Sequence, residues 1–341
     1  MSGHAGFAMR IEDLRRRLQS HGAKPCHEQQ VLRAWTQALP LESRRGRGHV
    51  LPASVRSSAP REFETIAAIR SEHPGSDGSV RLLVELSDGE SVETVLLPRG
   101  GLCVSTQVGC AVGCLFCMTG QAGLKRQLGS AEIVAQVVHA RSRRAVKKVV
   151  FMGMGEPAHN MDNVLDAIAL LGTLGGIGHK NLVFSTVGDL RVFERLAHAN
   201  VKPALALSLH TTDAELRARL LPRAPRIDPG VLVQLGESYA RATHYPIQYQ
   251  WTLLEGINDG DDDVERIAGL LRGKYAVMNF IAYNRIAGLA FNRTSRERAF
   301  AMVRALLDFG VLAKLRDSAG QDIDGGCGQL RARLTRSTPA A

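Results

Sequence analysis

The amino-acid sequence predicts an α/β protein that forms a partial or full (β/α) barrel. From Gly101 onward, short apolar runs alternate with amphipathic segments, which is typical of parallel strands joined by right-handed helical crossovers. Polar residues follow several of these apolar runs, and ligands of such folds bind at the carboxyl ends of the strands. An open, doubly wound sheet is the alternative architecture with the same alternation.

The expected strands are short and apolar, and each is followed by a segment with helical periodicity. Strands are expected at residues 102–107, 148–152, 182–185, 204–209, 247–254, 277–282 and 311–316. Helices are expected at residues 130–141, 163–174, 190–199, 213–220, 230–242, 262–271 and 295–309. This pattern places one helix after nearly every strand of the core.

The pattern before the core is different, so residues 1–95 are expected to form a small accessory domain and residues 96–341 the core. Its expected elements are helices at 11–21 and 28–39, an irregular Gly- and Pro-containing stretch at 43–60, and hairpin strands at 80–86 and 91–97. The turn Ser-Asp-Gly-Glu at 87–90 supports the hairpin.

Composition limits the class of protein. Of the 341 residues, 45% are hydrophobic and 22% charged, as in soluble globular proteins, and no apolar run is long enough to span a membrane. The 43 Lys and Arg outnumber the 33 acidic residues, and the net charge of +10 favours a polyanionic partner such as RNA. No apolar signal core precedes Arg10, so we expect a cytoplasmic protein, and we expect a monomer.

Three of the six cysteines, Cys110, Cys114 and Cys117, form a C-x3-C-x2-C cluster. An iron-sulfur cluster of the four-iron type usually has four cysteine ligands, so three leave one iron open to a substrate or cofactor. A structural zinc site is the alternative interpretation, but it needs a fourth ligand. No Cys or His lies between Cys117 and His139, and Cys103 is the only close upstream candidate.

These residues resemble a known family. The cysteine loop, with Phe116 before its last cysteine, is similar to the cluster loop of radical S-adenosylmethionine (SAM) enzymes. More narrowly, five segments between about residues 80 and 330 resemble, in order, the RNA adenine methyltransferases that act on ribosomal and transfer RNA. The segments are 92–95, 103–110, 151–157, 208–210 and 322–330. The resemblance implies a barrel of the radical SAM type, a [4Fe-4S] cluster, SAM, and a one-electron donor such as flavodoxin or ferredoxin.

The same resemblance implies a set of SAM contacts at the ends of the strands. They are Gly155, Glu156, Ser185, Ser208, Leu209, His210 and Asn284. The Glu156 carboxylate suits the ammonium group of SAM. Helix capping by the serines, and a hydrogen-bonded rim position for His210, are the alternative interpretations. The chain departs from the family at Arg285, where the family usually has proline.

The resemblance also assigns roles to three catalytic residues, Cys327, Cys103 and Glu93. It implies that Cys327 accepts a methyl group from one SAM and loses a hydrogen atom from it to a radical made from a second SAM. The methylene radical then adds to the adenine. Cys103 attacks Cys327, which forms a disulfide and releases the methylated RNA, and Glu93 takes the proton from the adenine carbon. For Glu93, an outward-facing strand carboxylate is the alternative.

The sequence therefore predicts a radical SAM RNA methyltransferase that modifies an adenine carbon, C2 rather than C8, in ribosomal or transfer RNA. Two alternatives stay open. One is a radical SAM enzyme of the same fold with another substrate. The other is a zinc-stabilised RNA-binding protein without catalysis.

Overall fold

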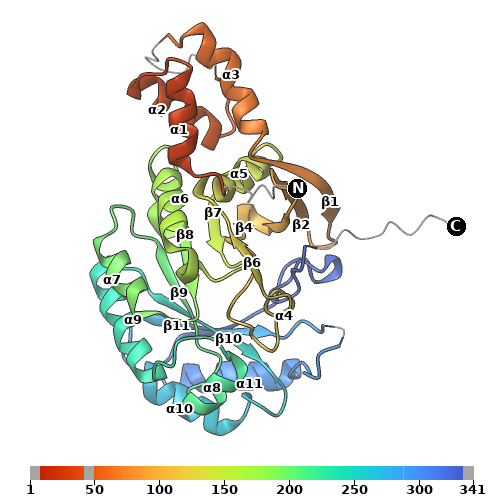
Figure 1. Cartoon of the computed structure of the whole chain (residues 1–341). Coiled ribbons are helices and arrows are strands. Elements are labelled where there is room, and N and C mark those ends of the chain that lie inside the picture. Colours follow the sequence, from red (N-terminus) through yellow and green to blue (C-terminus); the bar gives the residue numbers. More distant parts are fainter. Residues whose placement is uncertain (1–7, 42–49, 287, 333–341) are drawn as a thin grey trace, which may run out of the picture.

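A computed structural model describes residues 8–41, 50–286 and 288–332 (Figure 1). One sheet of ten strands dominates it, in the order β1-β2-β3-β4-β7-β8-β9-β10-β11-β12. These strands are β1 (Ala67–Pro74), β2 (Val80–Leu86), β3 (Ser91–Leu97), β4 (Gly101–Cys103), β7 (Lys148–Phe151), β8 (Leu182–Thr186), β9 (Ala204–Ser208), β10 (Ile247–Leu253), β11 (Ala276–Ala282) and β12 (Ala313–Arg316). A separate antiparallel pair, β5 (Gln107–Gly109) and β6 (Leu124–Gln127), flanks the cysteine loop.

The sheet is a partial barrel. All neighbouring strands from β4 to β12 are parallel, whereas β1 to β4 pair antiparallel. Within the described residues, β1 and β12 form the two edges and do not pair with each other. The partial form of the predicted barrel is therefore confirmed, and the closed form is not found.

Helices cover the outer face of the parallel strands (Figure 1). They are α5 (Ser130–Arg141), α6 (Met161–Thr173), α7 (Leu190–His198), α8 (Ala214–Leu220), α9 (Pro229–Thr243), α10 (Asp261–Leu271) and α11 (Arg296–Asp308), with the short α4 (Met118–Gln121) in the cysteine loop. Asp189, Asp213, Asp228 and Ser295 accept backbone N–H groups in the first turns of α7, α8, α9 and α11. These caps fix where each helix begins after a strand-end loop.

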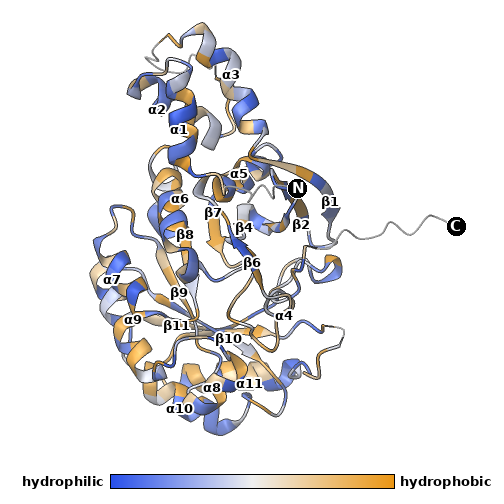
Figure 2. Cartoon of the chain, in the orientation of Figure 1, coloured by the Kyte–Doolittle hydropathy of each residue, from blue (hydrophilic) through white to orange (hydrophobic). Residues whose placement is uncertain are grey.

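Several strands beneath these helices are largely apolar, such as β7, whose arrow is orange in Figure 2. All five residues of β8 are buried, because helices cover one face and the barrel interior the other. Short 3-10 turns complete the connections, at η1 (Pro98–Gly100), η2 (Pro157–Asn160), η3 (His179–Asn181) and η4 (Gln321–Ile323). No helix in the described part of the chain has the length and apolar character needed to cross a membrane.

Three helices precede the sheet, α1 (Ile11–Ser20), α2 (Pro25–Thr36) and α3 (Ala53–Glu64). The third was not expected, because the sequence predicted an irregular stretch at 43–60; residues 42–49 of that stretch lie outside the described residues. Val55 and Ala59 of α3 are fully buried against Leu18 of α1. This apolar packing stabilises the helix despite its internal proline.

The accessory helices share a core with the barrel, because Ile11, Leu14, Leu32 and Trp35 belong to the main apolar cluster. The predicted hairpin of β2 and β3 also gains a third strand, β1. Since β3 pairs with both β2 and β4, the sheet is continuous across residues 95 and 96. A division of the chain at that point stays a prediction.

Candidate functional site

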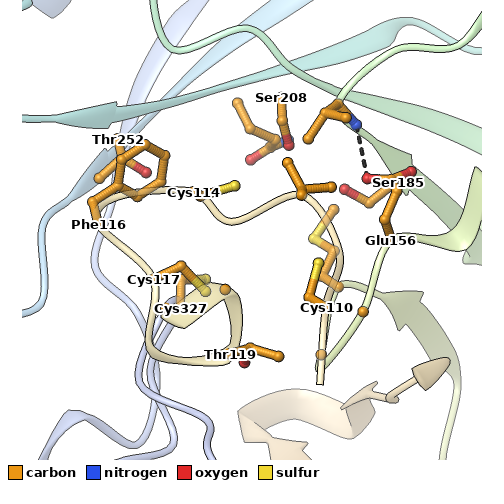
Figure 3. Close-up of a pocket in the computed structure, with 18 of the residues that line it drawn as sticks. Cys110, Cys114, Phe116, Cys117, Thr119, Glu156, Ser185, Ser208, Thr252 and Cys327 are labelled. Atoms are coloured by element: carbon orange, nitrogen blue, oxygen red, sulfur yellow. Dashed lines mark hydrogen bonds between the residues drawn. The ribbon is translucent and has the colours of Figure 1, made fainter. Parts of the chain in front are cut away.

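A pocket at the carboxyl ends of the parallel strands collects most of the residues that the sequence singled out (Figure 3). The cysteine loop supplies Cys110, Cys114, Phe116 and Cys117, and the C-terminal segment supplies Cys327. Other lining residues follow or end strands of the sheet; they are Gly155, Glu156, Ser185, Ser208, His210 and Thr252. Segments more than 200 residues apart in the sequence thus meet at one rim.

Glycines and backbone hydrogen bonds set the conformation of the cysteine loop. Gly109 and Gly113 have φ angles of +80° and +70°, and a Cβ on Gly109 would overlap the Gly123 carbonyl oxygen. The Cys110 N–H donates to that same oxygen at 2.9 Å, and the Cys117 N–H donates to the Cys114 carbonyl at 3.1 Å. The loop is therefore held before any ligand binds.

The environment of the three cluster thiols disfavours their negative charge. Burial raises the pKa of Cys110 to about 12, and burial followed by the neighbouring thiols raises the pKa of Cys114 well above its usual value. Burial also raises the pKa of Cys117. These thiols can act as thiolates only beside a strong positive charge, which metal ions provide.

Glu156 is a buried carboxyl that joins two strand ends. Its two carboxylate oxygens accept the N–H groups of Ala158 and Val187, each at 3.0 Å, and its own N–H donates to Gln107 Oε1 at 2.7 Å. Burial raises the pKa of Glu156 to about 7, although these hydrogen bonds oppose the shift. A side-chain hydrogen bond from Thr186 also stabilises the carboxylate. The carboxyl lines the pocket, where a cationic ligand can bind to it.

His210 has a left-handed backbone conformation, with φ +61°, which is unusual for a residue other than glycine. Its Nδ1 accepts the Thr252 N–H at 3.0 Å, so Nε2 carries the proton of the neutral ring. Burial, and secondarily the charge of Arg217, lower the pKa of His210 to about 3. The ring packs edge-on against Phe116, with centroids 4.8 Å apart, and so buttresses the cysteine loop.

Comparisons with known proteins agree with this arrangement. Residues 104–270 match the model of the radical SAM superfamily. A probable RNA methyltransferase of Aromatoleum aromaticum is 69% identical, with 96% of this chain and 94% of the relative covered. A probable RNA methyltransferase of Pseudomonas aeruginosa is 65% identical over 97% of both chains.

A solved structure is similar along nearly the whole chain. It is a radical SAM methyltransferase from Sphaerobacter thermophilus, with 34% sequence identity and a TM-score of 0.85, and the match covers 97% of this chain and 100% of that one. The chain belongs to the radical SAM RNA methyltransferase family. Membership implies a [4Fe-4S] cluster and SAM, so the pocket has to fit both.

The donor set fits a radical SAM cluster. Three cysteines border one pocket, and each would bind a different iron of a cluster. Among the described residues, no group of three or more His, Cys, Asp or Glu is arranged to hold a single metal ion. Opposite the thiols, the Glu156 carboxyl and the Ser185 and Ser208 side chains supply polar groups for an amino-acid ligand, and Gln250 Oε1 is buried without a protein partner.

Of the other two cysteines that the sequence singled out, Cys327 lines this pocket and Cys103 lies near Cys327. Cys327 is exposed and lies next to Cys117 in Figure 3. Burial, and secondarily the nearby Cys327 thiol, raise the pKa of Cys103 to about 12. All six cysteines are free in the structure, so the predicted disulfide between Cys103 and Cys327 is not formed.

Four predicted site residues do not line this pocket; they are Cys103, Leu209, Asn284 and Glu93. The Leu209 side chain lies in the main apolar core, and its N–H donates to the Gln250 carbonyl at 3.0 Å. Asn284 donates to the Cys327 carbonyl at 2.9 Å and thus contacts the segment that carries Cys327. Glu93 is buried on β3 and forms an ion pair with Arg81.

Arg217 is a residue of this site that the sequence interpretation missed. It is 3% exposed, and its guanidinium donates to the carbonyls of Val187 and Ser208 at the ends of β8 and β9. Burial lowers the pKa of Arg217 to about 10, while the charges of Cys114 and Glu156 favour its charged form. Its position one helical turn before buried Leu220 in α8 was the available signal, since a charged residue there faces inward.

Replacing Glu156 with glutamine is expected to weaken SAM binding by roughly ten- to hundredfold above pH 7, because a charge-assisted contact to the SAM ammonium becomes a neutral one. Below pH 7 the difference in SAM affinity should shrink, since the wild-type carboxyl, with its pKa of about 7, is then protonated and neutral like the glutamine side chain. Calorimetric titration of the holoprotein with SAM at pH 6 and pH 8 measures both effects. Equal affinity of the two proteins at pH 8 would exclude Glu156 from the SAM contacts.

Proposed function

We propose that this protein methylates carbon C2 of an adenine in ribosomal or transfer RNA through a methyl-cysteine intermediate on Cys327. The observation that carries the proposal is the position of Cys327. It lines the pocket of the cluster cysteines and lies beside Cys117, although more than 200 residues separate the two in the sequence. A radical SAM cluster needs only the three cysteines of the cysteine loop, because one of its irons stays open to SAM, so the exposed Cys327 thiol is available for another role. The relatives named probable RNA methyltransferases and the net charge of +10 support RNA as substrate.

The residues divide the work as follows. Cys110, Cys114 and Cys117 hold the cluster, and Glu156, Ser185, Ser208, His210 and Asn284, with the backbone of Gly155 and Leu209, bind or support SAM. When bound, the cluster and SAM supply one-electron chemistry that generates a carbon radical, which an unreactive ring carbon requires. A one-electron donor of the flavodoxin or ferredoxin type would supply the electron that this chemistry requires.

The protein's own thiols and carboxylate then complete the transfer. Cys327 carries the methyl carbon and bridges it to the adenine. Glu93 accepts the proton that the adenine carbon loses. The Cys103 thiolate attacks the Cys327 sulfur, so that an S–S bond forms while the C–S bond breaks. The electron pair of the C–S bond stays on the methylene carbon, which takes up a proton and remains on the base as the methyl group. Cys103 lies near Cys327, and because burial raises its pKa to about 12, its thiol has to lose a proton as it attacks.

An anaerobic assay tests the proposal. Reconstituted protein, SAM and a chemical one-electron reductant are incubated with ribosomal and transfer RNA that lack the modification, and the digested nucleosides are separated against standards. We expect 2-methyladenosine from the wild type and none from Cys327→Ala. Formation of 8-methyladenosine would change the assigned carbon, and unmodified RNA with normal SAM cleavage would favour a different substrate.

A further inference from the structure

The buried ion pair between Arg81 on β2 and Glu93 on β3 holds both ends of the segment that carries Cys327. Arg81 Nε donates to the Ile323 carbonyl at 2.6 Å, four residues before Cys327. Glu93 Oε2 accepts the Arg331 N–H at 2.8 Å, four residues after Cys327. We call residues 323–331 the Cys327 loop.

The register of the sheet explains why this pair faces the loop. Arg81 is opposite Val95, and Val95 is opposite Cys103, so the side chains of Arg81, Val95 and Cys103 share one face. Glu93 lies two residues before Val95 and shares that face too. The loop that ends the chain's described part crosses this face, with Gly325 packed near Val95.

The ion pair is sealed from solvent. The side chains of Arg81 and Glu93 are 6% and 1% exposed. Glu93 Oε1 accepts a hydrogen bond from the Arg81 guanidinium, and Oε2 accepts one from the Arg331 N–H. A base on RNA therefore cannot reach Glu93 in this conformation. The same conformation places Cys327 at the cofactor pocket.

We propose that the Arg81–Glu93 ion pair is a clasp for the Cys327 loop, and that Arg81 is its positioning residue. The closed clasp holds Cys327 at the cofactor pocket, where it accepts the methyl group. The clasp opens when the loop moves to let RNA reach Glu93. Both parts rest on the proposed function, because it makes Cys327 the methyl acceptor and Glu93 the base that receives the adenine proton.

Proton uptake by Glu93 then has a structural consequence. The proton passes from the adenine carbon to a carboxylate oxygen, and the carboxyl becomes neutral. A neutral carboxyl attracts the Arg81 guanidinium less strongly and is a weaker acceptor for the Arg331 N–H. The clasp stays open until the proton leaves Glu93.

The Cys327 loop also has contacts that do not involve Arg81 or Glu93, so the contribution of the ion pair can be tested separately. The Met118 N–H donates to the Gly328 carbonyl at 2.8 Å, the Thr119 hydroxyl donates to the Leu330 carbonyl at 2.6 Å, and Asn284 holds the Cys327 carbonyl. These contacts come from the cysteine loop and the end of β11. They remain when Arg81 is replaced.

The test measures hydrogen exchange of residues 324–331 in the holoprotein. Arg81→Gln is expected to speed exchange on the order of tenfold, because the clasp loses charge-assisted hydrogen bonds. Arg81→Lys should restore most of the protection, since it keeps the ion pair. Arg70→Gln is the matched control, because it removes an exposed Arg–Glu pair, 2.8 Å to Glu85, from the neighbouring strands.

A second pair of variants avoids the sheet, in case Arg81→Gln does not fold. Arg331→Pro removes both the backbone N–H that donates to Glu93 and the arginine side chain. Arg331→Ala removes the side chain alone and is its control. Faster exchange at Gly325 and Gly326 in the proline variant, and not in the alanine variant, is expected. Unchanged exchange in both Arg81→Gln and Arg331→Pro would overturn the clasp.

Methyl occupancy of Cys327 after incubation with SAM, read from the protein mass, gives the functional readout. Arg81→Gln should accept the methyl group on the order of tenfold more slowly, with unchanged iron content and SAM affinity. Failure of the clasp and failure of the proposed function give different results. If the wild type methylates RNA but exchange in the variants is unchanged, the clasp alone is refuted. If exchange in the variants rises as expected but the wild type never methylates RNA, the proposed function alone is refuted.

Discussion

Cys103→Ala protein, produced in iron-replete cells and purified without oxygen, is expected to carry covalently bound RNA. Cys327 and the cluster cysteines remain in this variant, so the methylene bridge between Cys327 and the adenine still forms. No second thiol is then in place to attack the Cys327 sulfur. Gel migration, nuclease sensitivity and the absorbance ratio of the purified protein measure the bound RNA, and sequencing the fragment identifies the substrate.

Two controls isolate this effect. Cys103→Ala/Cys327→Ala should purify free of RNA, because it lacks the bridging sulfur. Cys26→Ala should behave as the wild type, since Cys26 lies in α2, on an accessory helix outside the pocket. Cys103→Ala protein that is free of RNA, from cells whose wild-type protein modifies RNA, would refute resolution by Cys103.

Much of the fold could be predicted because the core repeats one simple unit. The helix expected at 130–141 has the bounds of α5, and each expected parallel strand overlaps an observed one. Apolar runs buried on both faces and amphipathic helices are properties of neighbouring residues, so periodicity detects them. The rule that ligands bind at the carboxyl ends of strands then predicted that the cysteine loop, Glu156 and Ser185 and Ser208 lie at one rim of the sheet.

The parts that were missed depend on contacts between distant residues. Strand β5 has only three residues, which is too short for a periodic signal, and its partner β6 lies on the other side of the cysteine loop in the sequence. Helix α3 depends on packing of Val55 and Ala59 against α1. Arg217 and Arg81 have charged side chains that are usually solvated, and only the folded chain brings their carbonyl and carboxylate partners together.

Cys114→Ala is expected to lose nearly all cluster iron and all RNA methylation, because two thiolates hold a four-iron cluster poorly. Cys110→Ala and Cys117→Ala should behave in the same way. Cys114 is the sharpest of the three tests, since Cys327 lies beside Cys117 and could supply a substitute thiolate there. Iron and sulfide analysis and the visible spectrum of anaerobically purified protein measure the loss.

Cys327→Ala is the matched control, because it removes a thiol from the same pocket that we do not assign to the cluster. This variant should keep roughly four irons per chain and the brown colour of the wild type while it makes no methylated RNA. The two variants thus separate cluster binding from methyl transfer. A colourless wild-type protein that contains zinc would support the non-catalytic alternative. Full iron content in Cys114→Ala would exclude Cys114 as a ligand, and the three-cysteine site that leaves one iron open would then be wrong.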